Sequence, residues 1–155
     1  MLTSILLAAA PVGADSGSVL NREVTGAFAG TTFWDLSTPG CSLVHQTFDG
    51  TYTPQKNGTG TFHIDVCPVF GTDGGFVAEG TFMLRDRRGA TLTGTVTGSY
   101  VTSAPPAIPF EFVLEVDDGT RAFADVDGTI LVTGVWDFVA NPGPVSGTLA
   151  GHLTP

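Results

Sequence analysis

Two histidines and a nearby aspartate are the first side chains in this sequence whose types and spacing could support chemistry. His45, His63 and Asp65 fall on the same face of two alternating segments that read as paired strands. If a disulfide between Cys41 and Cys67 sets the register, the two imidazoles stand directly opposite each other. Two imidazoles and a carboxylate can bind zinc or copper, but on an exposed strand pair they more commonly form a solvated face. We therefore predict no metal site.

A second group of polar side chains lies on the opposite, aromatic face of the alternating segments. The residues there that could donate or accept a hydrogen bond are Gln46, Tyr52, Tyr100 and Trp136. Asp, Glu and His are not expected on this face, so no general acid or base can be assigned. Chemistry would depend on shape, which holds reacting atoms close together, with Tyr52 or Tyr100 as a donor. Alternatively, both tyrosines are aromatic plugs whose hydroxyls reach solvent.

Strands must position these side chains, because apolar and polar residues alternate over many short stretches. The expected strands span Glu23 to Phe33, Ser42 to Thr53, Gly58 to Cys67, Phe76 to Asp86, Ala90 to Val101, Phe110 to Asp117, Asp127 to Phe138 and Val145 to Leu153. Gly, Pro, Asn and Asp punctuate the links between them. Most links are short enough to join antiparallel neighbours, which favours an up-and-down meander.

The aromatic and glycine residues indicate how these strands are arranged. Most aromatic residues fall on one face of the strands and most charged residues on the other, so the aromatic face is the buried one. Glycines such as Gly30, Gly134 and Gly147 recur on the aromatic face, where missing side chains relieve crowding in a tightly curved sheet. We therefore predict an all-β fold, a closed antiparallel eight-stranded barrel. A double-sheet sandwich of the same strands is the alternative.

Composition and charge limit the partners of the protein. The 155 residues carry six basic and fifteen acidic side chains, a formal net charge of −9. Because no basic stripe interrupts this acidity, we expect neither nucleic acid nor, after removal of the signal peptide, a membrane surface as a partner. No cluster of ligating residues indicates a cofactor, and we predict none. The length fits one domain with a sizeable core.

The N-terminal residues and the two cysteines indicate export. Residues 2–11 form a short apolar run, and the small residues up to Ala14 resemble a signal-peptidase site. We therefore interpret residues 1–14 as the remnant of a signal peptide and residues 15–155 as a single barrel domain. The alternative is that the apolar run is a strand of the domain. Cys41 and Cys67 would form a disulfide in an oxidising compartment, so we predict a secreted protein.

One segment carries a family resemblance. Residues 119–128, G-T-R-A-F-A-D-V-D-G, are followed by a strand that ends in W-D-F and preceded by G-T-V-T-G-S-Y and F-E-F-V-L-E-V. This pattern resembles the barrel of allene oxide cyclases, dirigent proteins and spirotetronate cyclases, and the likeness covers most of residues 76–153. The resemblance implies an apolar pocket that guides cyclisation or coupling, in a homodimer or homotrimer. The characterised cyclases keep polar or acidic groups inside, whereas this aromatic face holds no carboxylate.

Two functions follow from a closed barrel of this size, whose interior either is filled by side chains or holds one small ligand. The first is a secreted barrel that binds a small apolar molecule, and the resemblance implies a cyclase or isomerase. Its expected ligand-binding residues are Gln46, Tyr52, Phe62, Tyr100, Phe112 and Trp136. The second is a non-catalytic barrel with a solid aromatic core that acts through its surface. The apolar loop of residues 103–109 either caps a mouth of the barrel or serves as a stiff connector.

Overall fold

The structure is a computed structural model that describes residues 22–54, 58–101 and 105–155. The expected signal segment, the first residues of the predicted domain and the start of the Pro-rich loop lie outside these residues. Within the described ranges, no helix is long and apolar enough to cross a membrane.

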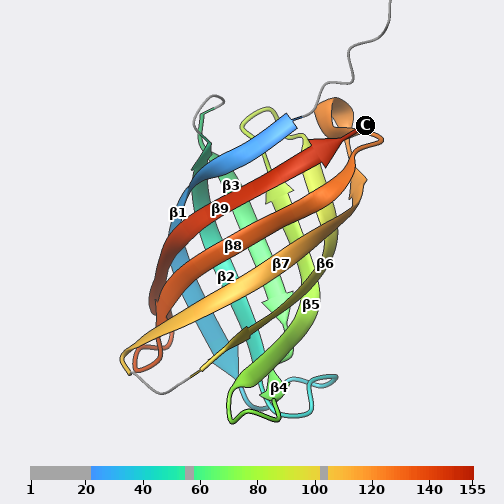
Figure 1. The fold of residues 1–155 in the computed structure, drawn as a ribbon. Coiled ribbons are helices and arrows are strands. Elements are labelled where there is room, and N and C mark those ends of the chain that lie inside the picture. Colours follow the sequence, from blue (N-terminus) through green and yellow to red (C-terminus); the bar gives the residue numbers. More distant parts are fainter. Residues whose placement is uncertain (1–21, 55–57, 102–104) are drawn as a thin grey trace, which may run out of the picture.

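In the described residues the chain forms nine strands and one short 3-10 helix (Figure 1). The elements are β1 Arg22–Asp35, β2 His45–Pro54, β3 Gly60–Val66, β4 Val69–Phe70, β5 Phe76–Arg85, β6 Thr91–Tyr100, β7 Ala107–Gly119, η1 Arg121–Phe123, β8 Asp127–Asp137 and β9 Gly143–Thr154. Each of the eight predicted strands is present, with ends that differ by a few residues. The two-residue strand β4, which pairs with β5, was not expected.

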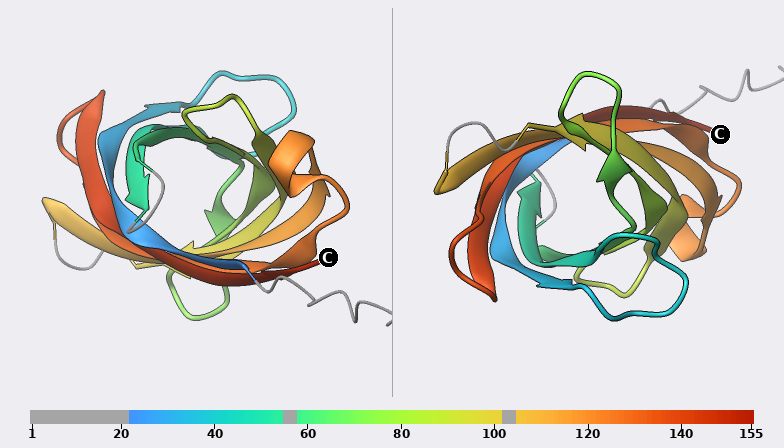
Figure 2. Two further views of the ribbon diagram at one scale, coloured as in Figure 1. Left: turned by 90° about the horizontal axis from the view of Figure 1, so that it is seen from above. Right: turned by 90° about the horizontal axis from the view of Figure 1, so that it is seen from below.

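Eight of these strands close into a barrel. Neighbours pair antiparallel in the order β3-β2-β1-β9-β8-β7-β6-β5, and pairing of β3 with β5 completes the ring. The end-on views of Figure 2 show this ring. The predicted closed antiparallel barrel is therefore confirmed, and the sandwich alternative is wrong. One end of the barrel carries β4, and the opposite end carries η1 and the C-terminus (Figure 1).

Alternation along the strands sorts side chains as predicted, with two exceptions at the β4 end. Strand β3, for example, alternates strictly between buried and more exposed positions. Of the aromatic residues expected inside, Phe76 is only half-buried and Phe138 is 41% exposed. Phe138 follows the last residue of β8, so it lies beyond the paired part of that strand.

Facing glycines allow the barrel wall to accommodate large rings on its inner side. Gly134 on β8 lies directly opposite Gly147 on β9. A Cβ atom on Gly147 would lie 2.6 Å from the Cα of Gly134 and 2.8 Å from the ring of Phe28. A Cβ atom on Gly134 would lie 3.0 Å from the ring of Phe110. The glycine pair therefore provides the space that the inward phenylalanines occupy, as the sequence pattern indicates.

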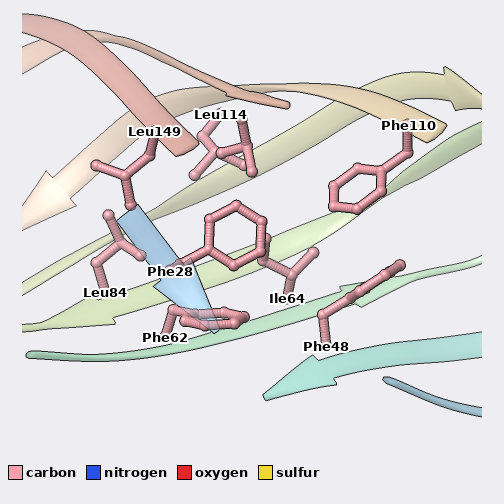
Figure 3. A pocket seen from close by; sticks show the side chains of 9 residues that line it. Phe28, Phe48, Phe62, Ile64, Leu84, Phe110, Leu114 and Leu149 are labelled. Carbon is pink, nitrogen blue, oxygen red and sulfur yellow. The ribbon is translucent and has the colours of Figure 1, made fainter. Parts of the chain in front are cut away.

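The middle of the barrel is solid. Figure 3 shows phenylalanine and aliphatic side chains converging from opposite walls. Phe28 meets Phe62 edge to face at 5.3 Å, and Phe48 meets Phe110 at the same centroid distance. The void between these side chains has a volume of only about 10 Å³, enough for one water molecule at most. A ligand cannot occupy this part of the barrel.

Two segment boundaries differ from the prediction for physical reasons. Strand β7 begins at Ala107 instead of Phe110, because Ile108 is fully buried and pairs with Trp136 on β8. The second half of the Pro-rich segment is therefore strand. Strand β2 begins at His45, because residues 36–44 form a loop at the β4 end.

Candidate functional site

A pocket of about 290 Å³ opens at the β4 end of the barrel, which we call the pocket mouth. Strands β1, β6 and β8 end there, and β2 and β5 begin there. The lining is almost wholly apolar and consists of Trp34, Leu36, Leu43, Val44, Gln46, Phe70, Phe76, Tyr100, Trp136 and Phe138. Three of these residues belong to the loop between β1 and β2, so this loop forms one wall of the pocket.

Six of the lining residues form a continuous series of ring contacts, which we call the aromatic rim. In order of contact these are Trp34, Phe138, Trp136, Tyr100, Phe76 and Phe70. Adjacent centroids lie between 5.1 Å and 6.3 Å apart, within the usual range for aromatic pairs. The rings come from five different strands or their ends, so the rim depends on closure of the barrel.

A buried chain of hydrogen bonds lies at the floor of this pocket. The hydroxyl of Tyr100 donates to Oε1 of Gln46 at 3.1 Å, and Nε2 of Gln46 donates to the hydroxyl of Thr32 at 3.2 Å. All three side chains are buried. Burial raises the pKa of Tyr100 well above its ordinary value, so the phenol stays neutral. Its proton is therefore held by Gln46, which fixes the orientation of both side chains.

The two indole N–H groups of the pocket have no acceptor. Among the described residues, Nε1 of Trp34 and Nε1 of Trp136 are buried side-chain polar atoms without a hydrogen-bond partner. Buried polar groups in proteins are almost always paired, so each exception requires an explanation. Both unpaired donors belong to residues that line the same pocket.

Two covalent and polar connections fix the walls of the pocket. The Cys41–Cys67 disulfide joins the loop before β2 to the residue that follows β3. On the other side, the side chain of Asn141 accepts from the backbone N–H of Trp34 at 3.2 Å and donates to its carbonyl at 2.8 Å. Asn141 lies in the turn between β8 and β9, so it ties the end of β1 to that turn. The predicted disulfide is present.

The expected ligand-binding residues do not all meet in one place. Gln46, Tyr100 and Trp136 line the mouth pocket. Phe62 lines the central void, and Phe112 is fully buried in the solid core. Among the described residues, Phe62 and Phe112 thus lie apart from the pocket that Tyr100 and Trp136 line.

Tyr52 is at the far end of the barrel. It lies near the end of β2, which is the end that carries η1, and is 4% exposed. Its pKa is raised mainly by burial and also by the negative charge of Asp86. Tyr52 thus acts as an aromatic plug at that end of the barrel.

The sequence did not indicate Trp34, Phe70 or the wall residues of the loop as part of a site. Trp34 lies an even number of residues after Phe28 on β1, so both side chains are on the inward face of the strand. Extending the predicted strand by one residue would therefore have identified it. The predicted strand stopped at Phe33 and missed it. Phe70 belongs to the unexpected strand β4, for which the sequence carries no clear signal.

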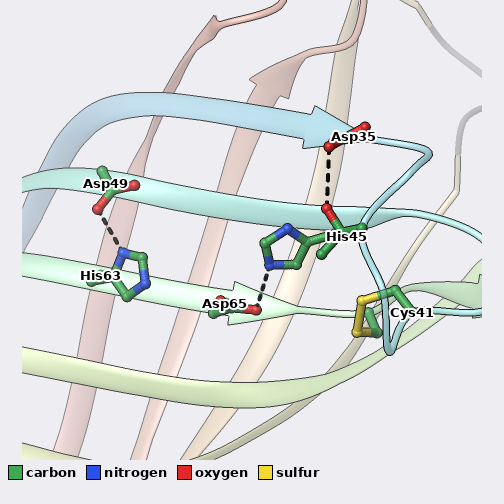
Figure 4. Close-up of polar contacts among 8 residues, drawn as sticks. Asp35, Cys41, His45, Asp49, His63 and Asp65 are labelled. Carbon is green, nitrogen blue, oxygen red and sulfur yellow. Dashed lines mark hydrogen bonds and ion pairs between the residues drawn. A yellow bond between two sulfur atoms is a disulfide. The ribbon is translucent and has the colours of Figure 1, made fainter.

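The expected juxtaposition of His45 and His63 is wrong. In the observed register His63 lies opposite Asp49, and its Nδ1 is 2.6 Å from that carboxylate. Nε2 of His45 contacts Asp65 at 2.9 Å (Figure 4). Cys41 lies in a loop outside the β2–β3 ladder, so the disulfide does not set the register. In the described parts of the chain, no three His, Cys, Asp or Glu residues are grouped as metal ligands.

The fold and the pocket define a closed eight-stranded antiparallel barrel with an apolar site at one mouth. The structure of the pterocarpan synthase dirigent protein GePTS1 is similar to this chain, with a TM-score of 0.52 over 97% of this chain and 98% of that one. The two sequences are 12% identical, so the likeness concerns the fold. The chain therefore has the dirigent-like barrel fold that its sequence pattern indicated. No family model and no curated protein matches the sequence.

Proposed function

We propose that the protein binds a small, mainly apolar organic molecule in the mouth pocket. The observation that carries this proposal is the open pocket of about 290 Å³ that the aromatic rim lines. Ligand pockets are typically about 300–1,000 Å³ and are lined mainly by apolar and aromatic side chains. The volume is at the lower end of this range, so the ligand should contain one or two rings rather than a long chain.

The lining supports binding more strongly than acid–base catalysis. The described residues that line the pocket include no Asp, Glu, His, Lys or Arg. The phenol of Tyr100, the most polar group beside Gln46, already donates to Gln46. The fold neighbour is named a synthase, and a cyclisation guided by shape is the form of catalysis that such a lining allows. Binding is the primary proposal, and shape-guided cyclisation is a secondary one that depends on it.

Export to an oxidising compartment is part of the proposal. The disulfide between Cys41 and Cys67 supports it, because such bonds persist in secreted proteins and are rare in the cytosol. The apolar run at residues 2–11 supports it as well.

Intrinsic fluorescence offers a direct test, because the chain has two tryptophans and both line the pocket. The full chain, expressed with export, is titrated with one- and two-ring aromatic molecules. We expect saturable changes in emission that weaken about tenfold in Phe76→Ala, which removes a ring from the rim. Phe33→Ala is the matched control, because Phe33 is 47% exposed and does not line the pocket. If no molecule changes the emission, the alternative function is favoured, in which a non-catalytic barrel acts through its surface.

A further inference from the structure

We propose that the ligand of the mouth pocket is a neutral molecule with a hydrogen-bond acceptor oxygen, such as a ketone, lactone or ether, which the indole N–H groups of Trp136 and Trp34 bind. This inference rests on the proposed function and specifies the chemical class of its ligand. Three features of the described residues carry it: the unpaired donors, the paired state of the other polar groups and the distribution of charge.

The unpaired donors require an acceptor. The side chain of Trp136 is only 3% exposed, and its Nε1 is shielded from solvent. A donor that leaves water without gaining a partner destabilises the folded state. Nε1 of Trp34 is also buried without a partner, although the Trp34 side chain as a whole is only half-buried, and both indoles pack against Phe138 in the rim. A ligand oxygen that reaches either N–H would restore the missing bond.

The other polar side chains of the pocket are already paired with one another. The phenol proton of Tyr100 goes to Gln46, and the amide of Gln46 donates to Thr32. The polar groups left without a partner are therefore both donors, and the complementary ligand group is an acceptor. A pure hydrocarbon would fit the rim but leave both indoles unpaired.

The charge distribution selects a neutral acceptor over a carboxylate. The five arginines in the described residues all lie toward the η1 end: Arg22 begins β1, Arg85 ends β5, Arg87 and Arg88 follow it, and Arg121 begins η1. Near the pocket mouth lie Asp35, Asp73 and Asp137, and no arginine pairs with them in the described part of the chain. His45, the basic side chain at this end among the described residues, already contacts Asp65. A bound carboxylate would therefore lose its hydration without gaining a free cationic partner, in a field of like charge.

Three compounds of similar size separate these possibilities: acetophenone, cumene and benzoate. The full-length, disulfide-bonded protein is labelled with nitrogen-15, and the two indole N–H resonances are followed during titration. We expect acetophenone to bind about tenfold more tightly than cumene, as one additional hydrogen bond allows, and to move the indole proton of Trp136 downfield. Benzoate should bind at least tenfold more weakly than acetophenone.

Trp136→Phe retains an aromatic ring and removes the donor, so it should abolish most of the preference for acetophenone over cumene. Tyr52→Phe, at the far end of the barrel, should retain the preference. If Trp136→Phe does not fold, the downfield shift in the unaltered protein decides. Equal binding of acetophenone and cumene with unmoved indole resonances would overturn this inference and leave the proposed function standing. Binding of none of the three would overturn both, and tightest binding of benzoate would overturn the inference alone.

Discussion

The hydroxyl of Tyr100 and the side-chain carbonyl of Gln46 are joined by a hydrogen bond of 3.1 Å between residues 54 positions apart in the sequence. Tyr100 ends β6 and Gln46 lies near the start of β2, so the bond crosses the interior between strands that are not neighbours. Both side chains are buried. The bond therefore links two walls of the barrel at the floor of the mouth pocket.

Removing the phenol tests the importance of this bond. Tyr100→Phe retains the ring and leaves Oε1 of Gln46 without its donor, which should lower the free energy of unfolding by about 1–2 kcal/mol. Urea denaturation followed by circular dichroism measures the change. Tyr52→Phe is the control, because the hydroxyl of Tyr52 makes no hydrogen bond within the described residues, and it should cost less than about 0.5 kcal/mol. Equal losses in the two variants would show that the bond contributes little.

Alkaline pH should destabilise the protein through the same residue. Burial raises the pKa of Tyr100, whereas an unfolded tyrosine releases its proton near pH 10. Above about pH 10 the unfolded state binds fewer protons than the folded state, so stability falls as pH rises, by up to about 1.4 kcal/mol per pH unit for this group. Urea midpoints between pH 8 and pH 11.5 should decline more steeply in the unaltered protein than in Tyr100→Phe. Parallel declines would show that the phenol titrates normally.

The disulfide should stabilise both the fold and the pocket wall. Cys41 and Cys67 are separated by 26 positions, and a crosslink of that span contributes about 3–4 kcal/mol in the chain-entropy model. The double variant Cys41→Ser/Cys67→Ser should lose about this much stability and should also bind ligands of the mouth pocket more weakly, because Leu43 and Val44 lie in the tethered loop. Denaturation and fluorescence titration of the same samples measure both effects. A variant that is destabilised but binds normally would show that the loop is positioned without the crosslink.

Alternation in the sequence was sufficient to predict the strands and their inward faces, because burial in a closed sheet has the same period of two as the strand itself. Alternation alone does not give the position of a residue along the barrel axis, which also depends on the direction of its strand. Tyr52 and Tyr100 both point inward, yet they lie near opposite ends of the barrel, because each is close to the C-terminal end of its strand and β2 and β6 run in opposite directions. The six residues expected in one site were therefore divided between the mouth, the core and the far end.

The sequence also could not predict the register between β2 and β3, because the loop that contains Cys41 intervenes. An alignment of β2 with β3 by the disulfide would place His45 opposite His63. The loop of residues 36–44 contains Cys41, so the crosslink lies beyond the end of the ladder, and Asp49 faces His63 instead. A cysteine pair constrains a register only when both residues belong to the paired strands.

The glycine pair in the wall provides a test of core packing. Gly147→Ala introduces a Cβ atom within 2.8 Å of Phe28 and 2.6 Å of the backbone of Gly134. Because neither the ring nor the strand can move freely, this overpacking should cost about 1–3 kcal/mol. Ser146→Ala, on the outward face of the same strand, should be nearly neutral. The melting temperatures of both variants test this prediction. If Gly147→Ala melts at the same temperature as the unaltered protein, the packing argument is wrong.

Asn141 provides the last test, because it connects a turn to the backbone of a residue in the pocket. Its side chain makes two hydrogen bonds to Trp34, one to the N–H and one to the carbonyl. Asn141→Ala removes both and should cost about 1–2 kcal/mol of stability. Because Trp34 is part of the aromatic rim, the freed end of β1 should also weaken ligand binding, and the emission of the two tryptophans should shift even without ligand.

Asn141→Asp separates the two bonds, since a carboxylate accepts from the N–H of Trp34 but cannot donate to its carbonyl. If Asn141→Asp restores tryptophan emission and Asn141→Ala does not, the bond to the N–H positions the indole; if both variants differ equally from the unaltered protein, the bond to the carbonyl is the one that matters.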